Sequence, residues 1–212
     1  FKFEFKITIL LLKKMENETL SQLVNQFESP LYVYNGNKIE EQYNRLTNAF
    51  TKIENFKIYY AVKALSNITV LKYLKKLGTG LDTVSLEEVE LGLYAGFKPD
   101  EIIFTPNGVS LNEIEKVAKL GVQINIDNLS ILEQFGTNNP SIPVCIRINP
   151  HVMAGGNANI SVGHIDSKFG ISIHQIPHLL RIVENTQMKI NGIHMHTGSD
   201  ILDVEVFLYA AE

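Results

Sequence analysis

The sequence of 212 residues predicts an α/β protein that contains an incomplete (β/α)8 TIM-type barrel. Three observations favour this fold. From residue 57 onward, short runs of β-branched and aromatic residues alternate with helical patterns. The alternation gives about six strand–helix units, which pair in parallel when helices separate them. No strand is followed by Gly-x-Gly-x-x-Gly, the fingerprint of a dinucleotide-binding doubly wound sheet.

The first unit of the expected barrel is a strand at 57–62 and a helix at 66–77 that ends at Gly78. Two later helices begin at Ser85 and Ser110. Each serine is an N-cap residue with a glutamate three positions on, which predicts a capping box. The other expected strands are 81–84, 101–105, 122–126, 143–148 and 190–195, and the other helices follow at about 129, at 175–185 and from about 203.

The residues before the barrel fall into two expected parts. Residues 1–14 hold a short apolar run between lysines, too short to span a membrane, and we expect an appendage outside the fold. Residues 15–56 are expected to lead into the barrel with a strand at 29–34 and a helix at 37–53. The barrel would then occupy 57–212. Because the last helical pattern has no end signal, we interpret the sequence as the N-terminal piece of a longer protein.

Composition favours a soluble, cytoplasmic protein. The apolar content of 45% and the charged content of 20% are ordinary for globular domains. The net charge of −4 argues against a nucleic acid partner. The single cysteine, Cys145, excludes a disulfide within the chain and favours a reducing compartment. No segment has the length of a membrane span.

Polar side chains stand at the expected carboxyl ends of the strands, which meet at one mouth of a barrel, where ligands bind. A neutral lysine amine in that mouth is a nucleophile for a carbonyl compound such as pyridoxal phosphate. Taken alone, a strand-end lysine more often extends to solvent, and strand-end acids more often cap helices. The arginine within an apolar strand requires a partner, which we expect to be one of these acids. The side chains are Lys63, Asp82, Asn107, Asp127, Arg147, His194 and His196.

Two features near the last strand have more than one interpretation. His194 and His196 lie two residues apart and face the same side of a strand, so the pair also suits a zinc site of a barrel metallohydrolase. No other expected strand ends in a histidine, which disfavours a metal. The following turn, Thr197-Gly-Ser199, opens the last expected helix and is a candidate phosphate-binding group.

Five motifs, in order, resemble the barrel-fold pyridoxal-phosphate decarboxylases, and among these the diaminopimelate decarboxylases. The resemblance covers about residues 28–200, beginning with Ser29-Pro-Leu-Tyr-Val-Tyr34. It departs from the family pattern at Leu86-Glu87, where two glycines are usual, at Thr197, and after Asn107-Gly108, where a lysine is usual. The motifs are Tyr60-Ala-Val-Lys63-Ala, Gly80-Leu-Asp82-Thr-Val-Ser85, Arg147-Ile-Asn-Pro150, Ser167-Lys-Phe-Gly170 and His194-Met-His-Thr-Gly-Ser199.

The resemblance implies a role for each matching residue. Lys63 would form the Schiff base with pyridoxal 5'-phosphate, and His196 would stack on the pyridine ring. Ser199 would bind the phosphate, and Asp82 and Arg147 would belong to the polar network around the cofactor. The resemblance thus accounts for the histidine pair without a metal. It also implies a barrel of the alanine racemase/decarboxylase kind and a second, C-terminal β-domain beyond this chain.

The implied activity is decarboxylation of meso-2,6-diaminopimelate to L-lysine and CO2, the last step of lysine biosynthesis, by a homodimer with its active site at the subunit interface. We expect the piece in hand to be inactive alone. Two alternatives stay open. One is a pyridoxal-phosphate decarboxylase of another basic amino acid (ornithine, arginine or carboxynorspermidine). The other is a non-catalytic homologue that binds pyridoxal phosphate.

Overall fold

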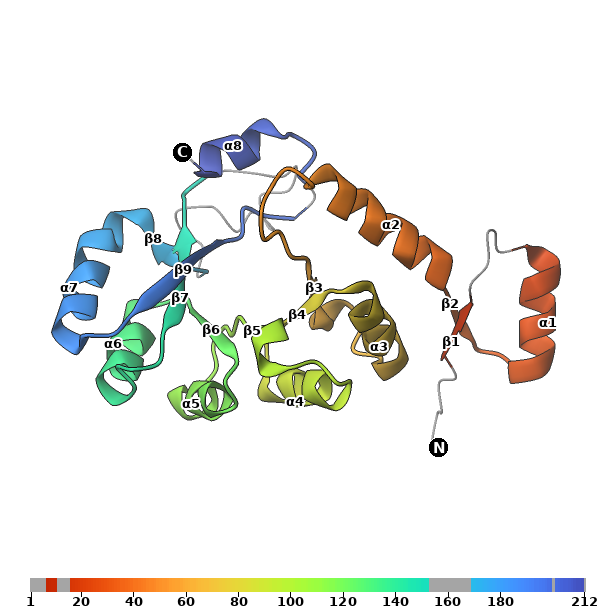
Figure 1. The fold of residues 1–212 in the computed structure, drawn as a ribbon, viewed down its shortest axis with the longest axis horizontal. Helices are drawn as coiled ribbons and strands as arrows, with labels where there is room; N and C mark the ends of the chain where they lie inside the picture. The colour runs from red at the N-terminus through yellow and green to blue at the C-terminus, as the bar shows by residue number, and fades with distance from the viewer. Residues whose placement is uncertain (1–6, 11–15, 153–168, 200, 212) are drawn as a thin grey trace.

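The computed structural model describes residues 7–10, 16–152, 169–199 and 201–211. Its main feature is a seven-stranded parallel sheet in the order β3-β4-β5-β6-β7-β8, with β9 also paired to β7. The strands form an open arc with the helices α3 to α7 outside it, so the expected partial α/β barrel is confirmed (Figure 1). The barrel elements are β3 (Tyr59–Ala61), α3 (Ile68–Leu77), β4 (Gly80–Thr83), α4 (Leu86–Tyr94), β5 (Ile102–Phe104), α5 (Leu111–Lys119), β6 (Gln123–Ile126), α6 (Leu129–Asn138), β7 (Val144–Asn149), β8 (Ile171–Ser172), α7 (Ile176–Thr186), β9 (Ile190–Met195) and α8 (Glu205–Ala211).

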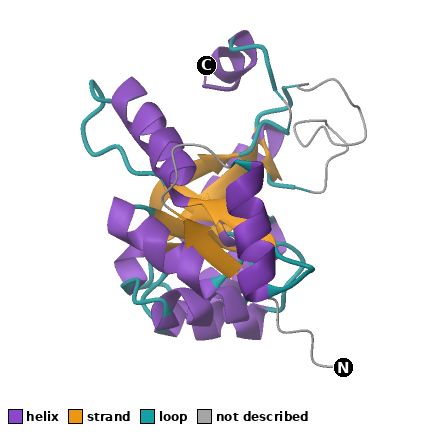
Figure 2. Cartoon of the chain, turned by 90° about the vertical axis from the view of Figure 1, so that its right-hand side faces the viewer, coloured by secondary structure: helices purple, strands orange, loops and turns teal. Residues whose placement is uncertain are grey.

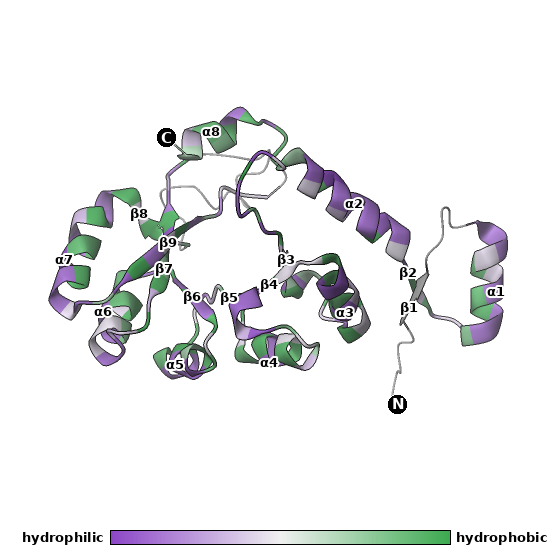
Figure 3. Cartoon of the chain, in the orientation of Figure 1, coloured by the Kyte–Doolittle hydropathy of each residue, from purple (hydrophilic) through white to green (hydrophobic). Residues whose placement is uncertain are grey.

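The apolar core lies between the sheet and the helices. Alternate residues of the strands point outward, and on β4 to β6 these outward residues are buried and mostly hydrophobic, whereas Ile193 and Met195 of β9 are exposed. Figure 2 shows the helices packed around the strands, and Figure 3 shows the mixed hydropathy of each helix, as amphipathic helices require. Fully buried members of this core include Leu71, Leu81, Val89, Ile102, Phe104, Val117, Ile124, Ile126, Leu132 and Phe135.

The inward face of the strands is largely polar. The parallel register places Ala61 beside Asp82 and Asn125 beside Cys145, so these side chains share the interior of the arc. The outward residues pack on the helices, and the inward ones are therefore free to form a polar site.

The expected serines cap their helices, but neither helix start forms the complete capping box that the sequence predicted. The Ser85 hydroxyl accepts from the backbone N–H of Glu88, whose carboxylate accepts from Val84 N at 2.8 Å. The Ser110 hydroxyl likewise accepts from Glu113 N. The expected capping box at this second helix is wrong, however, because the Glu113 carboxylate accepts from Leu86 N at 3.2 Å. Glu113 therefore helps to cap the neighbouring helix α4 rather than its own.

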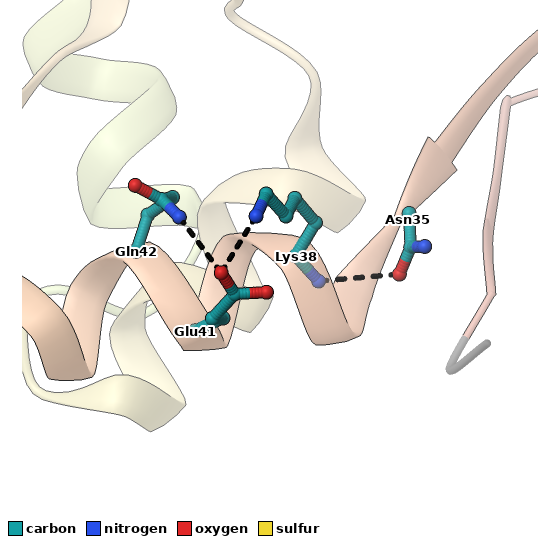
Figure 4. A network of polar contacts seen from close by, with 4 residues as sticks. All are labelled: Asn35, Lys38, Glu41 and Gln42. Carbon is teal, nitrogen blue, oxygen red and sulfur yellow. Dashed lines mark hydrogen bonds and ion pairs between the residues drawn. The ribbon is translucent and has the colours of Figure 1, made fainter. Parts of the chain in front are cut away.

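The N-terminal unit consists of α1 (Asn17–Phe27), β2 (Tyr32–Asn35) and α2 (Gly36–Ala49), with β1 (Ile7–Leu10) paired in parallel to β2. The pairing of β1 departs from the expectation that residues 1–14 lie outside the fold, as far as 7–10 are concerned; a β-branched apolar run suits a strand. Figure 4 shows the start of α2, where the Asn35 side chain accepts from Lys38 N and Glu41 accepts from Lys38 Nζ and Gln42 Nε2.

Two further differences concern the segments after β7. The sequence did not predict β8, a two-residue strand that pairs with the end of β7. The last helix, α8, begins at Glu205, so the turn at 197–199 does not open a helix as expected. The irregular stretch from 149 onward lies mostly outside the described residues, as do Ser167 and Lys168 of the fourth motif.

Candidate functional site

A cavity of about 310 Å³ lies at the carboxyl ends of the strands. Four of the five residues that the sequence assigned to the site line it: Lys63, Asp82, Arg147 and His196. Ser199 does not, although it follows His196 by three residues. Among the described residues, the lining consists of Lys63, Asp82, Val84, Thr105, Asn107, Arg147, Phe169, His194 and His196.

Lys63 reaches the cavity through a change of backbone conformation at the end of β3. The strand stops at Ala61, and a 3-10 turn over Val62–Ala64 follows, closed by the bond from Leu65 N to Val62 O at 3.1 Å. Val62 is fully buried in the outer core, while Lys63 is exposed and lines the cavity. The turn thus anchors one side chain in the core and directs its neighbour into the site.

Asp82 is held by a short hydrogen bond from a neighbouring strand. The Thr105 hydroxyl donates to Asp82 Oδ1 at 2.6 Å, and Asn125 Nδ2 donates to the Thr105 oxygen at 2.9 Å. Burial raises the pKa of Asp82, while the Thr105 bond and the positive charges of Lys63 and Arg147 act in the opposite direction. Burial therefore favours the neutral acid form of Asp82, and the Thr105 hydrogen bond and the two positive charges favour the carboxylate.

Asp127 is fixed by amides rather than by a cation. Asn107 Nδ2 donates to Asp127 Oδ2 at 2.7 Å, and Asn128 Nδ2 donates to Oδ1 at 3.1 Å. Two of the strand-end residues picked from the sequence, Asn107 and Asp127, thus bond to each other. The Asn128 side-chain oxygen also caps α6, so this acid is tied to the start of the following helix.

Arg147 lies buried, with 8% of its surface exposed, against the ring of Phe169 at 5.0 Å from the ring centre. The expected ion pair with an acid is wrong for the described residues, since neither Asp82 nor Asp127 comes within ion-pair distance of it. Burial lowers the pKa of Arg147, and attraction to Asp127 and Asp82 opposes this. The guanidinium is thus stabilised at a distance by two carboxylates and in contact by an aromatic face.

The two histidines are kept neutral at pH 7. His194 faces Arg147 across the β7–β9 register, and burial, with the charges of Arg147 and His196, lowers its pKa to about 4. Burial first, then Arg147 and Lys63, lowers the pKa of His196 as well. His194 Nδ1 is buried and has no hydrogen-bond partner among the residues that the structure describes. Within 7–10, 16–152, 169–199 and 201–211, no group of three or more His, Cys, Asp or Glu side chains is placed to hold a metal ion.

Ser199 lies on the surface in the irregular segment after β9. Its neighbour Thr197 is buried, and Gly198 has a positive φ of 148°. Because α8 begins only at Glu205, the helix N-terminus that was expected to help bind a phosphate is not at this position.

Sequence reasoning missed three site residues: Thr105, Asn125 and Phe169. The first two could have been found from the sequence. Each is a polar residue that alternates with buried apolar residues in an expected strand, and such a residue points to the opposite, inward face, as Ile103 and Asp127 do. Phe169 belongs to the Ser167-Lys-Phe-Gly170 motif, but no role in the site was assigned to it, because it comes from a long segment without a periodic pattern.

Comparison with known proteins adds a family match. Residues 36–212 match the family model described as "Pyridoxal-dependent decarboxylase, pyridoxal binding domain". The chain is 37% identical to the diaminopimelate decarboxylase of Methanothermobacter thermautotrophicus over 90% of this chain and 45% of that protein. It is 34% identical to that of Campylobacter jejuni over 90% of this chain and 48% of the relative.

The fold is also that of solved decarboxylases. A crystal structure of the Helicobacter pylori diaminopimelate decarboxylase, complexed with L-lysine, superimposes with a TM-score of 0.81 at 30% identity, over 91% of this chain and 50% of that one. The chain therefore spans about half the length of the relatives that it matches. None of the helices in the described part of the chain has the length and apolar character needed to cross a membrane.

Proposed function

The chain belongs to the pyridoxal-dependent decarboxylases through their pyridoxal-binding domain, and we propose that the protein decarboxylates meso-2,6-diaminopimelate to L-lysine with pyridoxal phosphate held by Lys63. One observation carries this proposal: Lys63 lines a cavity with Asp82, Arg147 and His196, within the residues that match the family. The substrate is supported by the diaminopimelate decarboxylases among the relatives, one of them solved with L-lysine bound.

The residues of the cavity suit an anionic aldehyde. Its volume of about 310 Å³ is at the lower end of the usual range for small-molecule sites. Lys63 supplies an amine for the aldehyde carbon, and the charge of Arg147 favours an anion. His194 Nδ1, which is buried and has no partner in the described part of this chain, offers a hydrogen bond to a ligand.

Each residue then has a defined task. Lys63 would hold the cofactor through a covalent bond from Nζ and release it to the substrate amine. His196, neutral at the rim of the cavity, would lie flat against the ring, and Ser199 would donate to the phosphate. Asp82 and Arg147 would fix the charge around the ring. Pyridoxal phosphate, when bound, supplies the electron sink that takes up the electron pair left as CO2 departs.

The test of the cofactor site is reduction of the purified full-length protein with borohydride, which makes an imine bond permanent. We expect a pyridoxyl group on the peptide that contains Lys63. Lys63→Ala should lose both this group and the absorbance of the bound cofactor, while Lys76→Ala, which removes an exposed lysine of α3, should keep both. A pyridoxyl group retained in Lys63→Ala would contradict the proposed role.

The substrate requires a separate assay, because ornithine, arginine and carboxynorspermidine decarboxylases share the cofactor chemistry. The amine product of each amino acid, identified by mass spectrometry, decides among them. Release of L-lysine from meso-diaminopimelate supports the proposal. A loaded protein that decarboxylates none of these substrates would instead be a non-catalytic pyridoxal-phosphate-binding homologue.

The proposal extends to assembly, location and domain division. We propose a cytoplasmic homodimer whose active site lies at the subunit interface, since His196 lines the cavity and is itself exposed, which leaves room there for a partner's residues. Residues 15–56 would lead into a pyridoxal-binding barrel from 57 to 212. Light scattering gives the subunit number. Activity regained on mixing two inactive variants, altered on opposite sides of the interface, would support the shared site.

A further inference from the structure

A chain of hydrogen bonds leads from the interior of the barrel to Asp82. Asn125 on β6 is 4% exposed, and Thr105, directly after β5, is 8% exposed. Asn125 Nδ2 donates to Thr105 Oγ1 at 2.9 Å, and Thr105 Oγ1 donates to Asp82 Oδ1 at 2.6 Å. The chain crosses three neighbouring strands and ends at the wall of the cavity.

The direction of this chain follows from the chemistry of its members. An amide nitrogen only donates, so the Thr105 oxygen accepts from Asn125. The single hydroxyl proton of Thr105 is then directed to Asp82, whose Oδ1 must accept. A carboxylate oxygen that accepts a bond at 2.6 Å is stabilised in its ionised form.

We propose that Asn125 and Thr105 are positioning residues that keep Asp82 ionised toward Lys63. The inference rests on the proposed function in one respect, that Lys63 is the residue that holds the cofactor. An ionised Asp82 draws the Lys63 ammonium into the cavity, and so orients the amine before it reacts. Without the two donors, burial would favour the protonated acid, which attracts the lysine less.

The other charged and titratable groups around Asp82 come from four strands or the residues directly after them. They act on it in wild type and variants alike, so they do not confound a comparison between them. They are Lys63 after β3, Asp127 after β6, Arg147 on β7, and His194 and His196 on and after β9.

The experiment follows the titration of the Asp82 carboxyl by 13C NMR in the full-length protein without cofactor, with Asp82→Asn used to assign the signal. Thr105→Val removes the donor with little change in shape. We expect the Asp82 titration to move up by about one pH unit, a shift that corresponds to the free energy of one charge-assisted hydrogen bond. Thr105→Ser should restore the wild-type titration. Asn125→Leu should move it up by less, since the hydroxyl remains.

Two controls separate this role from general loosening of the core. Thr83→Val removes a buried hydroxyl whose hydrogen bond goes to Ile103 O at 2.8 Å and not to Asp82, so the titration should stay in place. In the double variant Asn125→Leu/Thr105→Val the shift should equal that of Thr105→Val alone, because Asn125 acts through Thr105.

An unchanged Asp82 titration in Thr105→Val, or an equal shift in Thr83→Val, overturns the inference. Should Thr105→Val fail to fold, the Asp82 titrations of Thr105→Ser and Asn125→Leu are compared instead, since only Asn125→Leu should move the titration. The proposed function fails separately, by absence of the pyridoxyl group on Lys63. The Asp82 titration is measured without cofactor and does not depend on that result.

Discussion

Arg147 on β7 and His194 on β9 are direct partners in the parallel register of the two strands, so a buried guanidinium and a half-buried imidazole lie side by side on the inward face. This placement sets the charge of the site. A cation next to a partly dehydrated ring makes protonation of that ring costly, and the pKa of His194 falls to about 4. The site therefore takes its positive charge from Arg147 and Lys63 and not from its histidines.

Removing the guanidinium should change both histidines. In Arg147→Met the pKa of His194 should rise by roughly one unit, and that of His196 should rise too, because one repelling charge is lost while burial remains. Imidazole titration by NMR measures this. Arg181→Met, which removes an exposed arginine of α7, is the matched control and should leave both titrations in place. Equal titrations in Arg147→Met and wild type would show that burial alone sets the pKa.

The same depressed pKa predicts how stability depends on pH. Below about pH 6.5 the unfolded chain protonates His194, whereas the folded protein does so only near pH 4. The free energy of unfolding should therefore fall as pH decreases from 6.5 to 4, by on the order of 2 kcal/mol for this residue after allowance for the partial exposure of the ring. Urea unfolding at several pH values measures it.

His194→Gln isolates that contribution, because glutamine does not titrate. Between pH 6.5 and 4 the variant should lose less stability than wild type, and above pH 7 the difference between the two curves should no longer change with pH. Parallel curves for the two proteins would mean that His194 is protonated equally in both states.

The sequence predicted the strand order and most of the cavity wall for a physical reason. Parallel strands separated by helices must present their carboxyl ends together, so Lys63, Asp82 and Arg147 were brought to one place by topology alone. The predicted acidic partner of Arg147 was wrong, because ion pairing depends on how far each side chain reaches. Its aromatic partner Phe169 comes from a segment without periodicity, so the sequence did not predict this contact.

Helix capping also separates what local sequence predicts from what only tertiary contacts determine. Ser85 and Ser110 cap their helices as local rules require. The bond from Leu86 N to Glu113 joins two helices through residues that are 27 positions apart in the sequence, and no local pattern encodes it. The sequence also did not predict that the turn Thr197-Gly-Ser199 is separate from α8, which begins at Glu205, since the turn has the composition of one that opens a helix.

The cross-helix cap makes a prediction about coupling. Ser85→Ala and Ser110→Ala should each cost about 1 kcal/mol of unfolding free energy. If Glu113 caps α4, Glu113→Ala should couple to Ser85→Ala by about 0.5 kcal/mol or more, because both remove acceptors from the first turn of α4. It should be additive with Ser110→Ala. Urea unfolding of the single and double variants gives the two coupling energies, and coupling to Ser110 alone would restore the local capping box.

Gly170, at the end of the Ser167-Lys-Phe-Gly170 motif, has two reasons to be glycine. Its φ is +83°, a left-handed conformation that side chains disfavour. A Cβ there would also lie 2.9 Å from Asn149 N and 3.0 Å from Ile148 C, both backbone atoms of β7 that cannot move aside. Gly170→Ala should therefore push β8 away from β7 and carry Phe169 away from Arg147.

Gly108→Ala separates strain from crowding. Gly108 also has a positive φ, of +70°, but a Cβ there meets nothing within 4 Å, so alanine should cost only the conformational strain of about 1–2 kcal/mol. Gly170→Ala should cost this plus a further 1–3 kcal/mol from overpacking. It should also raise the pKa of His194 if Arg147 moves with Phe169, which Gly108→Ala should not do. Equal losses in the two variants would mean that β8 shifts freely, and that the tight approach of Gly170 to β7 does not hold Phe169 against Arg147.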